Sequence, residues 1–193
     1  MARDDPNKRR PDAATVADIS LIGPVDEAMA CKLREQLSDP PAGSGPLTID
    51  MTTLAGDPEM ARRMIVEVEA ARQRMPGRRL VFVGKTVVYS AGCTFMAGFP
   101  REDRYLTRDA TLLIHCRQLQ QTIELDGPIR AHLPKLKSMI AQLETGIELE
   151  EANFARLVEG SRVSMDELLE KALHNWYVCA DEAVERGLVA GVL

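Results

Sequence analysis

The chain has 193 residues, of which 45% are hydrophobic and 27% are charged, and its formal net charge is −5. This length and apolar content are sufficient for one domain with a substantial core. The slightly acidic balance argues against a nucleic-acid partner, which selects for a basic face. No apolar run approaches the length that spans a membrane, so no membrane association is expected.

The cysteines and histidines of the chain are few and scattered. The four cysteines are Cys31, Cys93, Cys116 and Cys179, with no C-x-x-C pair among them. This spacing argues against a metal ribbon or a disulfide scaffold and predicts a cytoplasmic protein with no metal and no cofactor. The charged opening segment, 1–14, lacks the apolar stretch of a secretory signal. We expect it to be a flexible tail before a single domain at 15–193.

In chain order, the first part alternates between predicted strands and predicted helices. Strands are predicted at 15–23, Leu47–Met51, Leu80–Val83 with its continuation to Ser90, Arg104–Leu106 and Thr111–Ile114. Helices are predicted at Glu27–Leu37 with Asp26 as N-cap, at about Glu59–Arg74 and at Cys93–Gly98. This alternation predicts an α/β fold with a parallel sheet made of repeated βαβ units.

The second part is predicted to be mainly helical. A long helix is expected over His132–Glu144, with Gly146 as its C-cap. Shorter helices are expected at Phe154–Glu159, at Met165–Ala172 with Ser164 as N-cap, and at Asp181–Arg186. A last apolar strand is expected at Leu188–Leu193.

Ser90 and His115 each follow an apolar run, 25 residues apart (115 − 90). A serine hydroxyl becomes a nucleophile when a base takes its proton, and histidine titrates in the appropriate range. Because open α/β sheets bind ligands at the carboxyl ends of their strands, the two side chains are candidates for one site. The simpler alternatives are a small residue at a turn for Ser90 and a hydrogen-bonded core histidine for His115.

Other candidates follow from local pattern alone. Four residues are candidates for the group that orients the histidine, and the local pattern does not choose among them: Asp166, Asn175, Asp181 and Glu182. Gly56 leaves a strand end and is either a turn glycine or a backbone donor at the same crevice. His132 and His174 are interpreted as ordinary surface or core residues.

Several motifs together resemble the Clp-type proteolytic subunits, which have a ClpP/crotonase-like fold. The motifs lie at Ile19–Asp26, Leu54–Asp57, Ser90–Gly92, Arg104–His115 and Ala180–Val189. The most specific is the last, which is similar to the family's closing Ala-x-Glu-Ala-x-x-x-Gly-Leu-(Val/Ile)-Asp signature. The resemblance covers most of residues 16–193.

The resemblance implies a serine-type endopeptidase that hydrolyses unfolded polypeptides or peptides through an acyl-enzyme. By position, Ser90 is the nucleophile, His115 the base and Asn175 the third triad residue, where the family has aspartate. The backbone N–H groups of Gly56 and Ala91 correspond to the oxyanion donors. The resemblance also implies a homo-oligomer, in the family a ring, and an AAA+ unfoldase as partner.

The sequence departs from the family pattern at four places. Asn175 carries no charge, and the same change in a trypsin-like triad costs about 10⁴ in rate. The oxyanion loop reads Leu-Ala-Gly instead of Pro-Gly-Gly, the segment Gln118–Ile123 lacks glycine, and Ala190 replaces the closing aspartate. These departures are compatible with a weakly active peptidase, and they leave two alternative interpretations open. One is a catalytically impaired homologue with a structural or regulatory role, and the other is a crotonase-type acyl-CoA enzyme, which stabilises an enolate with two N–H groups.

Overall fold

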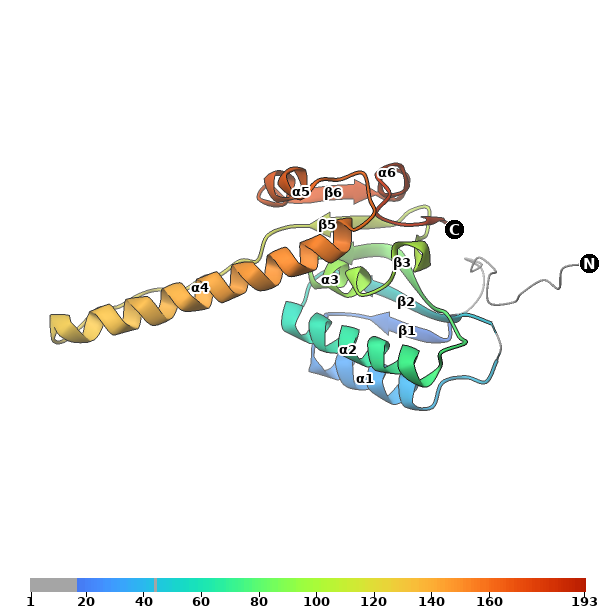
Figure 1. Ribbon diagram of the computed structural model, residues 1–193, viewed down its shortest axis with the longest axis horizontal. Helices are drawn as coiled ribbons and strands as arrows, with labels where there is room; N and C mark the ends of the chain where they lie inside the picture. The colour runs from blue at the N-terminus through green and yellow to red at the C-terminus, as the bar shows by residue number, and fades with distance from the viewer. Residues whose placement is uncertain (1–16, 44) are drawn as a thin grey trace, which may run out of the picture.

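The computed structural model describes residues 17–43 and 45–193 (Figure 1). The strands are β1 (Ile19–Ile22), β2 (Leu47–Thr53), β3 (Leu80–Tyr89), β4 (Arg104–Leu106), β5 (Thr111–Ile114), β6 (Trp176–Cys179) and β7 (Gly191–Val192). The helices are α1 (Glu27–Ser38), α2 (Pro58–Arg74), α3 (Ala91–Ala97), the 3₁₀ turn η2 (Arg101–Asp103), α4 (Ile129–Val158), α5 (Met165–Ala172) and α6 (Ala180–Glu185). The tail predicted at 1–14 and the start of the strand predicted at 15–23 lie outside these residues.

The sheet has seven strands, and those predicted from the alternating pattern pair in parallel. Its main path runs β1-β2-β3-β4-β7, while β5 pairs with β3 and carries β6 on its other side. Only the pair β5–β6 is antiparallel among the described strands. This arrangement confirms the α/β class and the βαβ organisation.

Strand β3 changes partner along its length, and this change opens the sheet where the site forms. Its first half pairs with β4, from Phe82 to Gly84, and its last half pairs with β5, from Val87 to Tyr89. Between the two halves Thr86 has a φ of 58°, a left-handed conformation that is rare for a β-branched residue. The bend lets one strand bring two neighbouring strand ends to the same edge.

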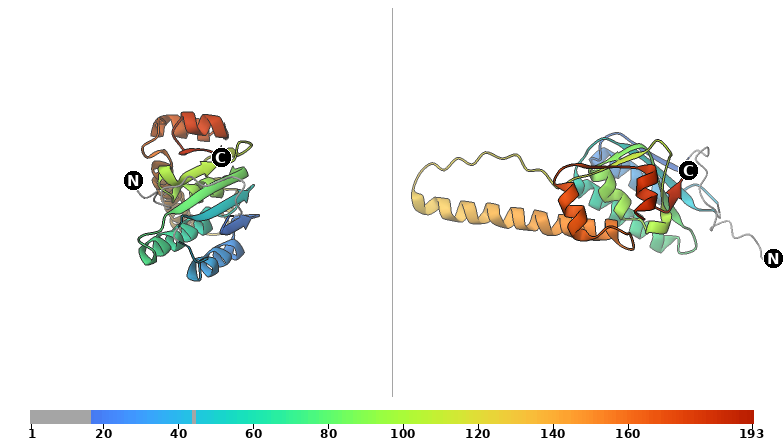
Figure 2. Two further views of the ribbon diagram at one scale, coloured as in Figure 1. Left: turned by 90° about the vertical axis from the view of Figure 1, so that its right-hand side faces the viewer. Right: turned by 90° about the horizontal axis from the view of Figure 1, so that it is seen from above.

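The main core lies between the sheet and helices α1, α2 and α3, which cover one of its faces (Figure 2). Alternation along β3 sends Leu80 and Phe82 into this core, whereas Val81 and Val83 face the other side and pack with Tyr105. The predicted helix α1 buries one apolar face, at Met29, Ala30, Leu33 and Leu37. Asp26 caps this helix as predicted, since its side chain accepts from the Met29 N–H at 2.9 Å.

The long helix is the largest correction to the sequence prediction. α4 runs without interruption through Gly146 to Val158, so neither the predicted end at Gly146 nor a separate helix at Phe154–Glu159 exists. Its 30 residues give a rod of about 45 Å at 1.5 Å per residue. Only its last turns pack on the body, and its first turns project beyond the body (Figures 1 and 2). A glycine signals a helix end only when the chain turns there, and here it does not.

The C-terminal part carries one strand that the sequence analysis missed. β6 lies between α5 and α6, where helix was expected to follow helix, and pairs with β5 from Thr111↔Cys179 to Ile114↔Trp176. Four residues that alternate buried and exposed give too short a pattern to stand out. The final strand is also shorter than the predicted Leu188–Leu193. In the described part of the chain, no helix combines the length and apolarity needed to cross a bilayer.

Candidate active site

Ser90 lies at the junction between β3 and α3, in an unusual backbone conformation. Its φ is 55° and its ψ is −113°, and α3 begins at the next residue. Its N–H donates to the carbonyl of Leu113 in β5 at 2.9 Å, which continues the parallel pairing by one residue. A non-glycine residue is held in such a conformation only by its surroundings, and such strain concentrates at functional sites.

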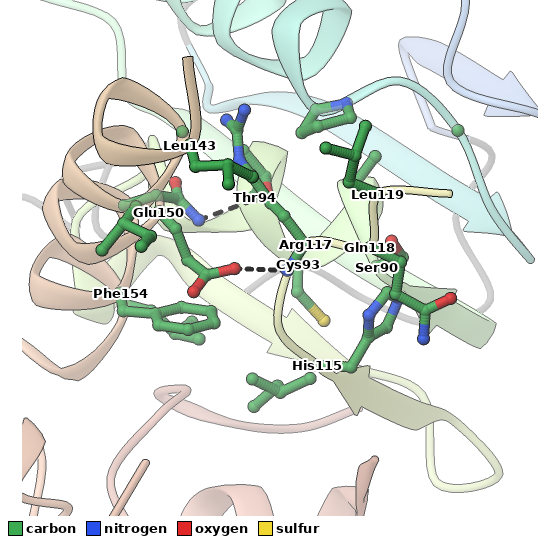
Figure 3. A pocket seen from close by; sticks show the side chains of 18 of the residues that line it. Ser90, Cys93, Thr94, His115, Arg117, Gln118, Leu119, Leu143, Glu150 and Phe154 are labelled. Atoms are coloured by element: carbon green, nitrogen blue, oxygen red, sulfur yellow. Dashed lines mark hydrogen bonds between the residues drawn. The ribbon is translucent and has the colours of Figure 1, made fainter. Parts of the chain in front are cut away.

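His115 follows β5 directly and therefore reaches the same sheet edge as Ser90. Both side chains are half-buried and line one pocket (Figure 3). The His115 Nδ1 lies 2.7 Å from the carbonyl oxygen of Cys116. Because a carbonyl only accepts, Nδ1 carries the proton and the Nε2 of the neutral ring is left as the base. Within the described residues, no hydrogen bond joins His115 to the Ser90 hydroxyl.

Two residues in the pocket lining, Ala91 and Gly56, are candidates to present a backbone N–H group to a ligand. Ala91 is the first residue of α3, so its N–H has no acceptor inside the helix. Gly56 follows β2 and lies against Val25, whose N–H and C=O bond to Ala55 and Asp57. No acceptor for the Gly56 N–H occurs in the described part of the chain. Both residues line the same pocket as Ser90.

The pocket has a volume of about 600 Å³ and lies between the strand ends and the packed end of α4. Its apolar lining comes from Ile114, Leu119, Leu143, Ile147, Phe154 and Leu157. Its polar lining comes from Ser90, Thr94, His115, Arg117, Gln118, Gln121, Gln142, Glu150 and Asn153. A pocket that combines an apolar wall with convergent polar groups is typical of a site for an organic ligand.

Asn175 lies outside the lining of the pocket that contains Ser90 and His115. The last residue pair of the antiparallel β5–β6 ladder is Ile114 with Trp176. Extending this register by one residue places Asn175 opposite His115. Its side chain is nevertheless exposed, it does not line the pocket, and its φ is 61°. Across 17–43 and 45–193 the Asn175 side chain has no hydrogen-bond partner, and the position that it would occupy at Nδ1 is taken by the Cys116 carbonyl.

The remaining candidates from the sequence also lie away from the pocket. Asp166, Asp181, Glu182, His132 and His174 are all absent from its lining. Glu182 is engaged instead with Arg186, 3.1 Å from its Nε. Gly92 faces the core, where an added Cβ would lie 2.5 Å from Thr53 Cγ2. The need for glycine at this position therefore comes from close packing against the core.

The site contains residues that the sequence analysis did not identify. Asn153 of α4 donates to the Thr94 hydroxyl of α3 at 3.2 Å, and Glu150 of α4 accepts from the Arg117 N–H (Figure 3). The prediction that the helix ends at Gly146 placed both α4 residues outside it. Cys93 is also in the lining, but burial raises the pKa of its thiol to about 12, so it is no nucleophile at neutral pH.

Ion pairs hold the side chain of Arg117, which belongs to the pocket lining. The Arg117 Nη1 lies 2.8 Å from a Glu59 carboxylate oxygen, and Arg62 lies 2.7 Å from the other one. Burial opposes the charge of Glu59, but the hydrogen bond and charge of Arg117 outweigh it and lower the pKa of this carboxyl. Within the described residues, no group of three or more His, Cys, Asp or Glu side chains is arranged to hold a metal ion.

The architecture is a ClpP-like α/β fold. No protein-family model matches the sequence, and no curated protein matches it. Among solved structures, the chain is similar to a ClpP1 point mutant from Listeria monocytogenes, with a TM-score of 0.69 and 17% sequence identity. The match covers 91% of this chain and 90% of that one. The likeness extends over nearly the whole molecule and confirms the predicted fold.

Proposed function

We propose that this protein is a serine-type peptidase of the ClpP-like fold, acting on unfolded polypeptides or peptides. The observation that carries the proposal is the conformation of Ser90, held at a φ of 55° between β3 and α3 in the pocket that His115 also lines. A strained strand-to-helix turn exposes a serine hydroxyl and puts a free helix N–H next to it. The pairing of β3 with β5 supports the shared position of the two side chains.

In the proposed reaction, Ser90 Oγ attacks the peptide carbonyl while His115 Nε2 takes its proton. The N–H groups of Gly56 and Ala91 hold the oxyanion of the tetrahedral intermediate. His115 then returns the proton to the leaving amine, which leaves an acyl-enzyme on Ser90, and water resolves this ester by the same steps. The apolar wall of the pocket favours extended chains with apolar side chains. No cofactor is part of the scheme.

A second candidate is a homologue that has the fold but does not catalyse. Two observations favour it, since Ser90 and His115 share no hydrogen bond and the Asn175 side chain is exposed. Catalytic groups are often misaligned when no ligand is bound. The peptidase proposal expects Ser90 and His115 to align when a ligand binds, whereas the second candidate does not.

The test is hydrolysis of an unfolded, fluorescently labelled polypeptide by the purified protein and by Ser90→Ala. The peptidase proposal expects cleavage that Ser90→Ala abolishes, with an unchanged unfolding temperature. Cleavage that persists in Ser90→Ala would assign the activity to a contaminant or to another site. No cleavage by the native protein in any assembly state would favour the second candidate.

The proposal includes self-association through α4. Its projecting turns expose Ile129, Leu133 and Ile140, and the segment before it exposes Leu119, Ile123 and Leu125. Exposed large apolar side chains mark an interaction site in proteins where they gather in a patch. A homo-oligomer of the ring type, fed by an AAA+ unfoldase and located in the cytoplasm, is the assembly that we propose by analogy of fold.

A further inference from the structure

One peptide group connects the candidate base to a carboxylate on α4. The carbonyl of Cys116 accepts from His115 Nδ1 at 2.7 Å, and the N–H of Arg117, in the same peptide group, donates to Glu150. A trans peptide directs its C=O and its N–H to opposite sides. His115, the peptide and Glu150 therefore form one continuous chain of hydrogen bonds.

From this chain we infer that Glu150 is a positioning residue for His115, acting through the Cys116–Arg117 peptide. The inference rests on the peptidase proposed above. A carboxylate that accepts from the N–H polarises the peptide and makes its carbonyl a stronger acceptor. Glu150 thereby supplies, at one remove, the negative charge that Asn175 lacks.

The surroundings of Glu150 are arranged to keep it there. It is half-buried at the packed end of α4, one turn from Asn153, whose amide ties the helix to Thr94 of α3. The Arg117 side chain is held from the other side by Glu59 of α2 at 2.8 Å. Burial, followed by the nearby Glu150 charge, raises the pKa of the Cys116 thiol, consistent with a carboxylate close to this peptide.

The alternative positioning residue is Asn175, and the two make different predictions. Glu150→Gln preserves the shape and an acceptor oxygen but removes the charge. Glu151→Gln is the matched control, since Glu151 is exposed on the same helix. Asn175→Ala removes the other candidate. If Glu150 acts as inferred, Glu150→Gln lowers the rate of serine acylation about tenfold, the difference between a charged and a neutral acceptor. Glu151→Gln and Asn175→Ala stay within about twofold of the native rate.

The structural readout is nitrogen NMR of the histidine rings, with His115 assigned by His115→Ala. We expect the native ring to be protonated at Nδ1, with a strongly hydrogen-bonded Nδ1 proton. That resonance is expected to shift in Glu150→Gln and to be unchanged in Asn175→Ala and Glu151→Gln. A resonance that changes in Asn175→Ala, or that is insensitive to Glu150→Gln, overturns the inference.

A measurement on the native protein covers the case in which Glu150→Gln does not fold. The Arg117 amide proton is expected to exchange slowly with solvent, whereas that of the exposed Gln118 exchanges quickly. Fast exchange at Arg117 overturns the inference. Since the ring resonances are read without turnover, a protein that shows them but never acylates refutes the proposed peptidase and leaves the role of Glu150 in holding His115 intact.

Discussion

At the scale of single residues, the candidate site depends on two backbone positions as much as on side chains. Ser90 is held at a positive φ of 55°, and Gly56 lies so close to Val25 that an added Cβ would be 2.5 Å from the N, O and Cβ atoms of Val25. At that separation the loop after β2 has to move. One added methyl group at Gly56 is therefore sufficient to displace its own N–H group, which is one of the two proposed oxyanion donors.

We expect Gly56→Ala to reduce peptide hydrolysis by about 10²-fold or more, the usual cost of losing one oxyanion donor. Gly45→Ala is the control, because an added Cβ there meets nothing within 4 Å. The measurement is kcat for a short peptide. A Gly56→Ala protein as active as Gly45→Ala would remove this N–H from the mechanism.

At this scale the sequence pointed to the proposed nucleophile and the proposed base but not to the residues that surround them. Ser90 and His115 stand out because each follows an apolar run that ends at a sheet edge. Glu150 does not stand out, because its role depends on α4 passing through Gly146 and on one backbone N–H, which no side-chain pattern records. The exposed orientation of Asn175 likewise depends on its backbone conformation.

At the scale of elements, amphipathic spacing predicted α1 and α2 closely, since one face of each is buried against the sheet. It failed on α4, which projects from the body and has no such constraint over its first turns. Gly146 in the middle of this helix is unfavourable relative to alanine. An added Cβ there meets nothing within 4 Å.

We therefore expect Gly146→Ala to stabilise the protein by about 0.5–1 kcal/mol. Denaturant unfolding of the native protein and of Gly146→Ala measures this difference in the free energy of unfolding, provided that both show the same dependence on denaturant concentration. A destabilised Gly146→Ala protein would mean that α4 bends or ends at this residue in solution.

A second element-scale prediction concerns Arg104 of β4, a buried arginine that joins several helix ends. Its guanidinium donates to the carbonyls of Ala97, Phe99, Arg156, Leu157 and Leu188, at 2.7–3.4 Å. Burial lowers its pKa to about 10, which leaves it charged at neutral pH. Arg104→Met leaves these carbonyls unpaired, and we expect a loss of about 3 kcal/mol or more.

Equilibrium unfolding in urea measures this loss, with Arg108→Met as the comparison, because Arg108 is exposed. We expect the comparison variant to lie within about 0.5 kcal/mol of the native protein. Equal stability of the two variants would show that Arg104 does not fasten the end of α4.

At the scale of the whole molecule, the exposed apolar residues of α4 predict self-association. Replacing Leu133 and Ile140 together by glutamine is expected to lower the sedimentation mass to that of the monomer without changing the unfolding temperature. Lys137→Gln, on an exposed position of the same helix, is expected to leave the mass unchanged. A native protein that is already monomeric would contradict the proposed assembly.

The central claim is that Ser90 is a nucleophile activated by His115, and labelling with a fluorophosphonate tests it most directly. The account predicts stoichiometric labelling of the native protein and its loss in both Ser90→Ala and His115→Ala, with folding preserved in each. Native protein that is not labelled in its assembled state, at about pH 6–9 where a histidine base works, would contradict the claim and leave the fold without this chemistry.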